Sequence, residues 1–255
     1  MAEAIVAGIV GKQVVPAADV CMTDISEERL LYVFEKYGVE TSIDNLAAVA
    51  VADVVVLAVK PQVFPSVWPE IVVALRPDTL VVSIMAGIPS VRIADGKPFR
   101  IVRVMPNTPA LVGEGAAGIS AGEFARTEDL EVVKKLMEAV GMAVIVKEDD
   151  IDAVSALSGS GPAYIFYLLE GMLKAADQMG LEQGISRELA LATVTGAAKL
   201  MLETGEDADV LRTKVTSKGG STAAATNTMD ERGVKEAIVA ALLAAQARGR
   251  ELANA

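Results

Sequence analysis

A Gly-Gly pair between hydroxyl residues is the clearest sign of chemistry in the chain. The run Thr216-Ser-Lys-Gly-Gly-Ser-Thr222 stands directly before a helical pattern. The first turn of a helix offers backbone N–H groups that have no intrahelical partner, and these groups bind anions. The run therefore predicts a seat for a small carboxylate. An ordinary capped helix is the alternative that the run alone leaves open.

Three further segments follow predicted strands and consist mainly of small or turn-forming residues. They are Ala58-Val-Lys-Pro61, Met85-Ala-Gly87 and Met105-Pro-Asn-Thr-Pro109. Open parallel sheets bind ligands at the carboxyl ends of their strands, and small residues let a flat cofactor approach the backbone. Any one segment could be only a loop, but three at successive strand ends predict one shared crevice.

Asp24 and Asn45 are candidates for the adenosine side of a dinucleotide. Asp24 ends a predicted strand, where a carboxylate can accept a hydrogen bond from the ribose 2′-hydroxyl of NAD and repel a 2′-phosphate. It could equally be a helix N-cap. Asn45 could contact the adenosine or could be only a turn residue.

The composition excludes several classes of function. The 255-residue chain has no histidine and a net charge of −11. Without histidine the commonest acid–base group and metal ligand is lacking, so we expect no metal site and chemistry that depends on a cofactor. The negative charge argues against nucleic acid or an anionic membrane as a partner.

Apolar residues make up 52% of the chain, yet no run approaches the roughly 18 that a membrane helix requires. We therefore expect that apolar surface is buried against other copies of the chain. The single cysteine, Cys21, and a start without a signal-peptide pattern favour the cytoplasm.

Short β-branched runs alternate with helical patterns in the first half, which is typical of βαβ units and a parallel sheet. The predicted strands are Val20–Asp24, Val54–Val59, Leu80–Ile84, Ile101–Val104 and Ala143–Val146. The second of these is apolar on both faces, as expected of a central strand. One helix should begin at Asp24 or Ser26 and end at Gly38, and another should lie near Leu130–Val140.

The second half has only helical patterns, near Ala163–Met179, Arg187–Thr204 and Val234–Leu252. We place the boundary at Glu148-Asp149-Asp150 and interpret this acidic stretch as a solvated linker. The prediction is a dinucleotide-binding domain over residues 1–150 and a helical domain over residues 151–255.

The chain opens with a helical pattern over Met1–Ile9, without a strand or a glycine-rich turn before it. A dinucleotide-binding fold places both before that helix, where the turn holds the pyrophosphate. Lack of the strand should leave a gap in the middle of the sheet and backbone groups without partners.

Three motifs together resemble those of pyrroline-5-carboxylate reductases, in the same order and at comparable spacing. They are Val104-Met-Pro-Asn-Thr-Pro109, Ser158-Gly-Ser-Gly-Pro-Ala-Tyr164 and Val215-Thr-Ser-Lys-Gly-Gly-Ser-Thr222. The resemblance covers the whole chain, and the last motif is the most specific. It implies a Rossmann-like α/β domain followed by an all-helical dimerisation domain, an interlocked dimer that can assemble into a ring of dimers, and NADP or NAD as cofactor.

The resemblance also implies roles for residues. Cofactor contacts fall on Met1, Asn45, Ala58, Val59, Lys60, Pro61, Met85, Ala86 and Gly87, and we add Asp24, Met105, Pro106 and Asn107 from their places at strand ends. Substrate contacts fall on Ser217, Gly219, Gly220, Ser221 and Thr222. The implied reaction is reduction of 1-pyrroline-5-carboxylate to L-proline by NAD(P)H, the last step of proline biosynthesis, with the Thr222 hydroxyl at the ring nitrogen.

The chain departs from the family pattern at three places. Thr226 stands where an aliphatic residue is usual, which could loosen the packing behind the substrate loop. Asp24 favours NAD(H). Similar enzymes begin with a strand and Gly-x-Gly-Asn ahead of the Met1 helix, so we expect that roughly a dozen residues are missing relative to the functional protein.

Two other functions stay open on the sequence. One is a different Rossmann imine or β-hydroxyacid dehydrogenase, for which Lys174 or Lys199 would be the acid. The other is a non-catalytic dinucleotide-binding or scaffold protein.

Overall fold

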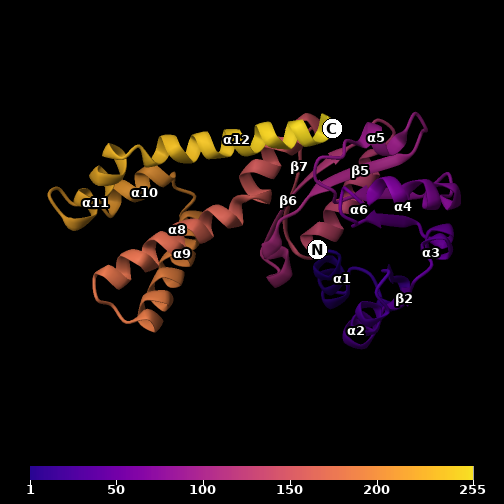
Figure 1. The fold of residues 1–255 in the computed structure, drawn as a ribbon, viewed down its shortest axis with the longest axis horizontal. Helices are drawn as coiled ribbons and strands as arrows, with labels where there is room; N and C mark the ends of the chain where they lie inside the picture. The colour runs from indigo at the N-terminus through magenta and orange to yellow at the C-terminus, as the bar shows by residue number, and fades with distance from the viewer. Residues whose placement is uncertain (255) are drawn as a thin grey trace. The chain divides into compact units, whose positions relative to one another are not determined.

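The computed structural model describes residues 1–254, in which strands and helices alternate as far as β7 and helices alone follow (Figure 1). The strands are β1 (Cys21–Thr23), β2 (Glu40–Ser42), β3 (Val54–Leu57), β4 (Leu80–Ser83), β5 (Arg100–Met105), β6 (Gly115–Ala121) and β7 (Gly141–Ile145). The α-helices are α1 (Ala2–Gly11), α2 (Glu27–Tyr37), α3 (Asn45–Val51), α4 (Phe64–Ile71), α5 (Ser90–Ala94), α6 (Thr127–Glu138), α7 (Ile151–Val154), α8 (Gly161–Gln178), α9 (Gln183–Thr204), α10 (Ala208–Lys214), α11 (Ser221–Glu231) and α12 (Val234–Asn254). All the predicted strands are present, whereas β2 and β6 were not predicted.

The sheet is in two pieces. β3, β4, β5, β6 and β7 form one sheet in that order, parallel except for the antiparallel pair β5–β6, while β1 and β2 form a separate parallel pair. No strand among residues 1–254 joins β1 to β3. The predicted interruption of the sheet is therefore present.

The interruption makes β3 an edge strand within the described residues, so the prediction of a central strand is wrong for them. At its two ends β3 accepts hydrogen bonds from β4, from Leu80 N–H to Asp53 O (2.9 Å) and from Ile84 N–H to Leu57 O (3.2 Å). Backbone groups alternate in direction along a strand, so those of Val54 and Val56 point away from β4. On that side the described chain provides no neighbouring strand.

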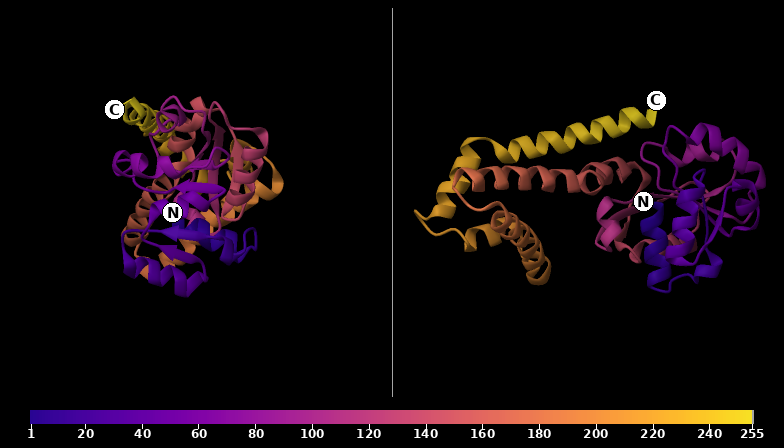
Figure 2. Two further views of the ribbon diagram at one scale, coloured as in Figure 1. Left: turned by 90° about the vertical axis from the view of Figure 1, so that its right-hand side faces the viewer. Right: turned by 60° about the horizontal axis from the view of Figure 1, so that its bottom comes forward.

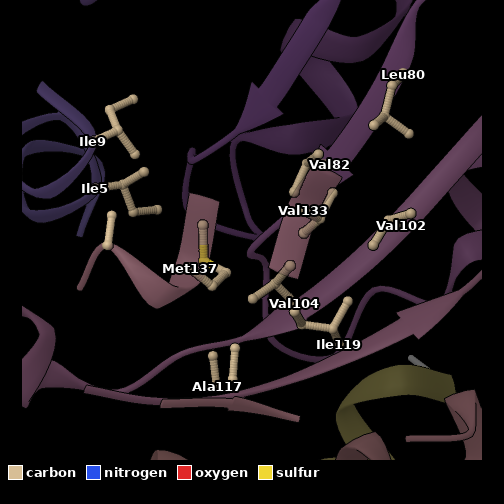
Figure 3. Packing of buried hydrophobic residues seen from close by; sticks show 12 residues of the cluster. Ile5, Ile9, Leu80, Val82, Val102, Val104, Ala117, Ile119, Val133 and Met137 are labelled. Carbon is tan, nitrogen blue, oxygen red and sulfur yellow. The ribbon is translucent and has the colours of Figure 1, made fainter. Parts of the chain in front are cut away.

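Both faces of the larger sheet are covered by helices. On one face α1 and α6 pack on the strands, and Figure 3 shows Ile5 and Ile9 of α1 directed toward the same cluster as Met137 of α6. On the other face α3, α4 and α5 contribute Val49, Trp68 and Ile93 to a second buried cluster. This layering is the α/β architecture expected for the first half of the chain.

The helix α2 begins and ends at the predicted residues. The Ser26 Oγ accepts the Arg29 N–H (3.3 Å) at its start, and Gly38 closes it in the left-handed conformation at φ 67°. These are the two caps that the sequence predicts, because a hydroxyl satisfies a first-turn amide and glycine tolerates positive φ.

By its internal contacts the chain divides into two compact units. One is Met1–Pro162 with the chain from Ala244 onward, and the other is Ala163–Leu243. The last strand, β7, ends at Ile145, while the first unit continues to Pro162 and includes the end of the unbroken helix α12 (yellow in Figure 2). The domain bounds of 1–150 and 151–255 stay a prediction.

The helical unit buries very little of its own apolar surface. Ala176 and Ala190 are its only buried apolar side chains among the described residues, whereas Phe166, Tyr167 and Leu202 are 59%, 78% and 84% exposed. No helix within residues 1–254 is long and apolar enough to cross a membrane. So much exposed apolar surface indicates that another protein surface covers this unit.

Glu3 of α1 joins the first two helices through a polar cluster. Its carboxylate accepts a hydrogen bond from the Tyr37 hydroxyl (2.7 Å) and pairs with Arg29 and, at 3.2 Å, with Lys36. The hydrogen bond from Tyr37 and the two cations lower the pKa of Glu3 from 4.5 to about 2, against the opposing effect of desolvation.

This cluster should make the stability of the fold depend on pH in the acidic range. A carboxylate with a lowered folded-state pKa stabilises the fold above its unfolded-state pKa, and that contribution is lost as the pH falls. We expect the free energy of unfolding to decrease from pH 4.5 toward pH 2, and Glu3→Gln to lack this part of the decrease. Urea unfolding of both proteins across this range measures it. An identical acid dependence in the two proteins would contradict the assignment.

Candidate active site

The register of three parallel strands aligns the ends from which three predicted cofactor segments emerge. Leu57 of β3 pairs with Ser83 of β4, and Ser83 pairs with Arg103 of β5. Ala58–Pro61, Met85–Gly87 and Met105–Asn107 follow within two residues of these positions. The structure therefore brings the three segments together at the carboxyl ends of neighbouring strands in one sheet, as predicted.

The first segment is open to solvent. Ala58 and Lys60 are exposed, and Val59 and Pro61 are half-buried. The Lys60 carbonyl accepts the N–H groups of Val63 (2.8 Å) and Phe64 (3.3 Å), which turns the chain into α4. A ligand at this edge can thus reach the backbone and the ammonium group of Lys60.

The second segment offers mainly backbone. Met85 is 3% exposed and packs in the second core cluster, so its side chain is not available to a ligand. Ala86 is exposed, and Gly87 has φ +70°, a conformation that side-chain-bearing residues rarely adopt. Contact with a cofactor would fall on Ala86 and Gly87.

The third segment is held by the Asn107 side chain, which is buried. Its amide nitrogen donates to the Ser158 carbonyl (3.0 Å), and its amide oxygen accepts the Ala116 N–H (2.9 Å). Asn107 thereby fastens the turn after β5 to β6 and to the π-helical turn η5 (Ser155–Gly159). This structural role of Asn107 was not foreseen, and its predicted contact with a cofactor stays a prediction.

Asp24 and Asn45 follow the aligned ends of β1 and β2, in which Thr23 pairs with Ser42. The Asp24 carboxylate accepts the Ser26 N–H (2.9 Å), so it supports the start of α2. Asn45 is the first residue of α3, and the N-cap of that helix is Asp44, whose carboxylate accepts the Ala47 N–H (3.0 Å). Both candidates thus lie at the same end of the small sheet.

The helix α1 begins directly after Met1. Its N-cap is Met1, which makes no side-chain hydrogen bond to the first turn. Free first-turn amides at the start of the first crossover helix are where a Rossmann fold holds pyrophosphate. Met1 stands directly before this helix, and its predicted contact with a cofactor stays a prediction.

The predicted substrate segment lies in the helical unit, at the start of α11. The Gly220 N–H donates to the Ser217 carbonyl (3.0 Å), and Gly219 has φ +72°, so Ser217–Gly220 is a tight turn. The N-cap of α11 is Gly220, and no side chain among residues 1–254 caps the helix. The amides of Ser221 and Thr222 are therefore open to an anion, whereas the Gly220 amide is engaged.

Thr226, one of the departures from the family pattern, is satisfied locally. Its hydroxyl donates to the carbonyl groups of Thr222 (3.0 Å) and Ala223 (3.3 Å) one turn earlier. These hydrogen bonds satisfy the hydroxyl, so Thr226 introduces no unpaired polar group into the helix behind the substrate turn.

Glu148 is the residue that the sequence interpretation misjudged. A solvated linker was predicted, and Asp149 and Asp150 are exposed. Glu148 instead accepts hydrogen bonds from Ser90 and Arg103, at positions 58 and 45 residues away along the chain. The prediction is wrong for Glu148 because a partner distant in sequence leaves no local signal.

The fold and these sites define a class of NAD(P)-dependent oxidoreductases, with a Rossmann-like domain joined to a helical domain. A family model described as pyrroline-5-carboxylate reductase dimerisation matches residues 148–252, and one described as NADP oxidoreductase, coenzyme F420-dependent, matches residues 1–87. A pyrroline-5-carboxylate reductase of Pseudomonas aeruginosa is 39% identical over 257 aligned positions, which cover 100% of this chain and 94% of that protein. The chain belongs to the pyrroline-5-carboxylate reductase family.

Solved structures agree with this membership. A pyrroline-5-carboxylate reductase from Coxiella burnetii superposes with a TM-score of 0.92 at 40% identity, over 98% of this chain and 94% of that one. A pyrroline carboxylate reductase from Plasmodium falciparum, solved with NADP bound, gives a TM-score of 0.88 at 26% identity, over 98% and 93% of the two chains.

The hydrogen bonds of Asn107 should contribute measurably to stability. Asn107→Ala leaves the Ala116 amide and the Ser158 carbonyl without their partner, and we expect it to lower the free energy of unfolding by about 1–3 kcal/mol. The exposed neighbour Thr108 provides the control, since Thr108→Ala should stay within about 0.5 kcal/mol of the parent. Urea unfolding compares the three proteins. Equal stability of the two variants would show that these bonds contribute nothing.

Proposed function

We propose that this chain reduces 1-pyrroline-5-carboxylate to L-proline by hydride transfer from NAD(P)H. The observation that carries the proposal is the turn Ser217–Gly220, which opens onto the uncapped first turn of α11. Its support is family membership over the full length of the chain.

The dinucleotide would be held by the first unit. Ala58, Lys60 and Ala86 are exposed at the carboxyl ends of β3 and β4, and the first-turn amides of α1 suit a pyrophosphate. The residues at the strand ends and at the start of α1 therefore fit this cofactor. When bound, it supplies the hydride.

The substrate carboxylate would be held by the amides of Gly219, Ser221 and Thr222. The Gly220 amide already donates within the turn, so it shapes the seat rather than contacting the anion. A protonated cyclic imine has an electron-poor carbon, to which the hydride adds while the nitrogen keeps its proton. The chain's lack of histidine is compatible with this reaction because the protein's task is binding, orientation and exclusion of water.

Thr222 would be the catalytic residue. It stands in the first turn of α11, two residues after the Gly220 N-cap. Its hydroxyl would hydrogen-bond the ring nitrogen and thereby orient the ring while the adjacent amides hold the carboxylate.

Asp24 would favour NADH over NADPH. Its carboxylate is half-exposed at the end of β1, and the nearby Arg29 is paired with Glu3. A cation occupied in this way does not compensate the repulsion between Asp24 and a 2′-phosphate.

The protein would work as a dimer formed through its helical domain, with a ring of dimers as the larger assembly. The exposed apolar side chains of α8 and α9, such as Phe166, Tyr167 and Leu202, support this proposal. A helical unit with so little core of its own gains most of its buried surface from a second copy.

We also propose that the protein works in the cytoplasm. The proposal rests on Cys21, the chain's single and exposed cysteine, because a reducing compartment keeps such a thiol free.

A β-hydroxyacid dehydrogenase would require a lysine acid in the helical domain. Lys174 and Lys199 are both exposed, and Lys199 lies 3.8 Å from Glu203 in an ion pair on the surface of α9. Neither lysine makes a contact within residues 1–254 that points to an acid role, so we favour the imine substrate.

The Thr222 hydroxyl provides the test of the proposed function. We expect Thr222→Ala to lower kcat by about 100-fold, in the range typical for loss of a positioned hydrogen-bonding group, with a near-unchanged melting temperature. Cofactor oxidation is followed with 1-pyrroline-5-carboxylate and with a panel of keto and hydroxy acids.

The matched control is Thr228→Ala on the same helix, because the Thr228 hydroxyl donates only to the Ala224 carbonyl (2.9 Å). It should retain the parent's kcat. Turnover of hydroxy acids in place of the imine would overturn the proposed function, and unchanged kinetics in Thr222→Ala would remove Thr222 from the mechanism.

A further inference from the structure

The carboxylate of Glu148 gathers three hydrogen bonds at the point where the chain leaves β7 for the helices. It accepts the Ser90 N–H at 2.7 Å, the Ser90 hydroxyl at 2.5 Å and a terminal guanidinium nitrogen of Arg103 at 3.2 Å. Glu148 opens the short 3₁₀ turn η4 (Glu148–Asp150), which leads directly into α7. All these groups lie in the first compact unit.

The partners of Glu148 sit next to two of the three segments at the carboxyl edge of the sheet. Ser90 begins α5, three residues after Gly87. Arg103 lies on β5, two residues before Met105. One carboxylate therefore connects both predicted cofactor segments to the chain that enters the helices.

Arg103 is more enclosed than Glu148, which is 27% exposed and lines a pocket together with Asp152 and Arg250. The Arg103 side chain is 6% exposed, and its Nε has no hydrogen-bond acceptor among the described residues. A Cβ added at Gly122 would lie 2.9 Å from the Ser90 Cβ, so the end of β6 packs tightly against Ser90. Glu148 is thus the acceptor on which a nearly buried guanidinium depends.

A second hydrogen bond connects the same part of the chain to the sheet. Asn107, at the turn after β5, donates to the Ser158 carbonyl in η5, ten residues beyond Glu148. The segment from Glu148 to Ser158 is thereby fastened at both ends to the loops of the sheet edge. Contacts at both ends fix the orientation of residues 148–158, whereas a contact at one end would allow these residues to rotate about it.

We propose that Glu148 is a positioning residue for hydride transfer, acting through Ser90 and Arg103 to fix Met85–Gly87 against Met105–Asn107. The inference rests on the proposed function of these two segments. Small displacements of a bound reactant reduce turnover strongly, so loosening either segment should affect catalysis more than folding.

The test compares Glu148→Gln with Glu138→Gln in the full chain. Glutamine keeps the size and one acceptor of Glu148 but removes the charge that faces Arg103. We expect kcat to fall about tenfold and KM for NAD(P)H to rise several-fold, while KM for 1-pyrroline-5-carboxylate stays within about twofold. Glu138 is the control because its exposed ion pair with Lys134, at 3.8 Å, touches neither segment.

Ser90→Ala tests whether the groups act together. Alone it removes one of the two bonds from Ser90 and should lower kcat less than Glu148→Gln does. In the Glu148→Gln background it should add little, because the two changes break the same contact. If the double variant lost kcat by the product of the two single losses, Ser90 and Glu148 would act independently, which would contradict the proposal.

Amide hydrogen exchange gives a readout that does not depend on activity. We expect residues 86–90 to exchange faster in Glu148→Gln than in the parent or Glu138→Gln, by a larger factor than the rest of the chain. Parent-like kinetics and exchange in Glu148→Gln would overturn the proposal, as would activity losses that only follow a loss of folded protein. If the parent enzyme did not reduce the imine, the proposed function would be wrong. The exchange comparison would still decide whether Glu148 fixes residues 86–90.

Discussion

The parallel pairing of β3, β4 and β5 decides where the candidate site can form. Their register places Leu57, Ser83 and Arg103 side by side, and the chain leaves each strand at the same edge. Short loops cannot move far from the strands that end in them, so the loops after these residues begin side by side, where a parallel sheet can bind a ligand. Glu148 and Asn107 then tie these loops to the start of the helices.

The sheet is interrupted between β1 and β3. β1 and β2 pair only with each other, and β3 has one side without a neighbouring strand among residues 1–254. The helix α1 nevertheless packs on the larger sheet with Ile5 and Ile9, and Glu3 joins it to α2. Helix packing and this polar cluster therefore hold in place the elements that strand pairing leaves separate.

The sequence predicted well what local patterns encode. The β-branched runs of β3 and β4, the caps of α2 and the glycine turn before α11 were all foreseen. β6 was missed because Gly115-Ala-Ala-Gly-Ile-Ser-Ala121 has only one β-branched residue and forms a strand by pairing with β5. The site contacts of Glu148 and Asn107 were missed because their partners are distant in sequence.

The central claim is that one sheet edge receives the dinucleotide, and amide hydrogen exchange with and without NADH or NADPH tests it most directly. Binding should slow exchange together at Val59–Lys60, Ala86–Gly87 and Met105–Asn107, while the far ends of the same strands stay unchanged. Protection confined to other parts of the chain, or none at saturating cofactor, would contradict the account.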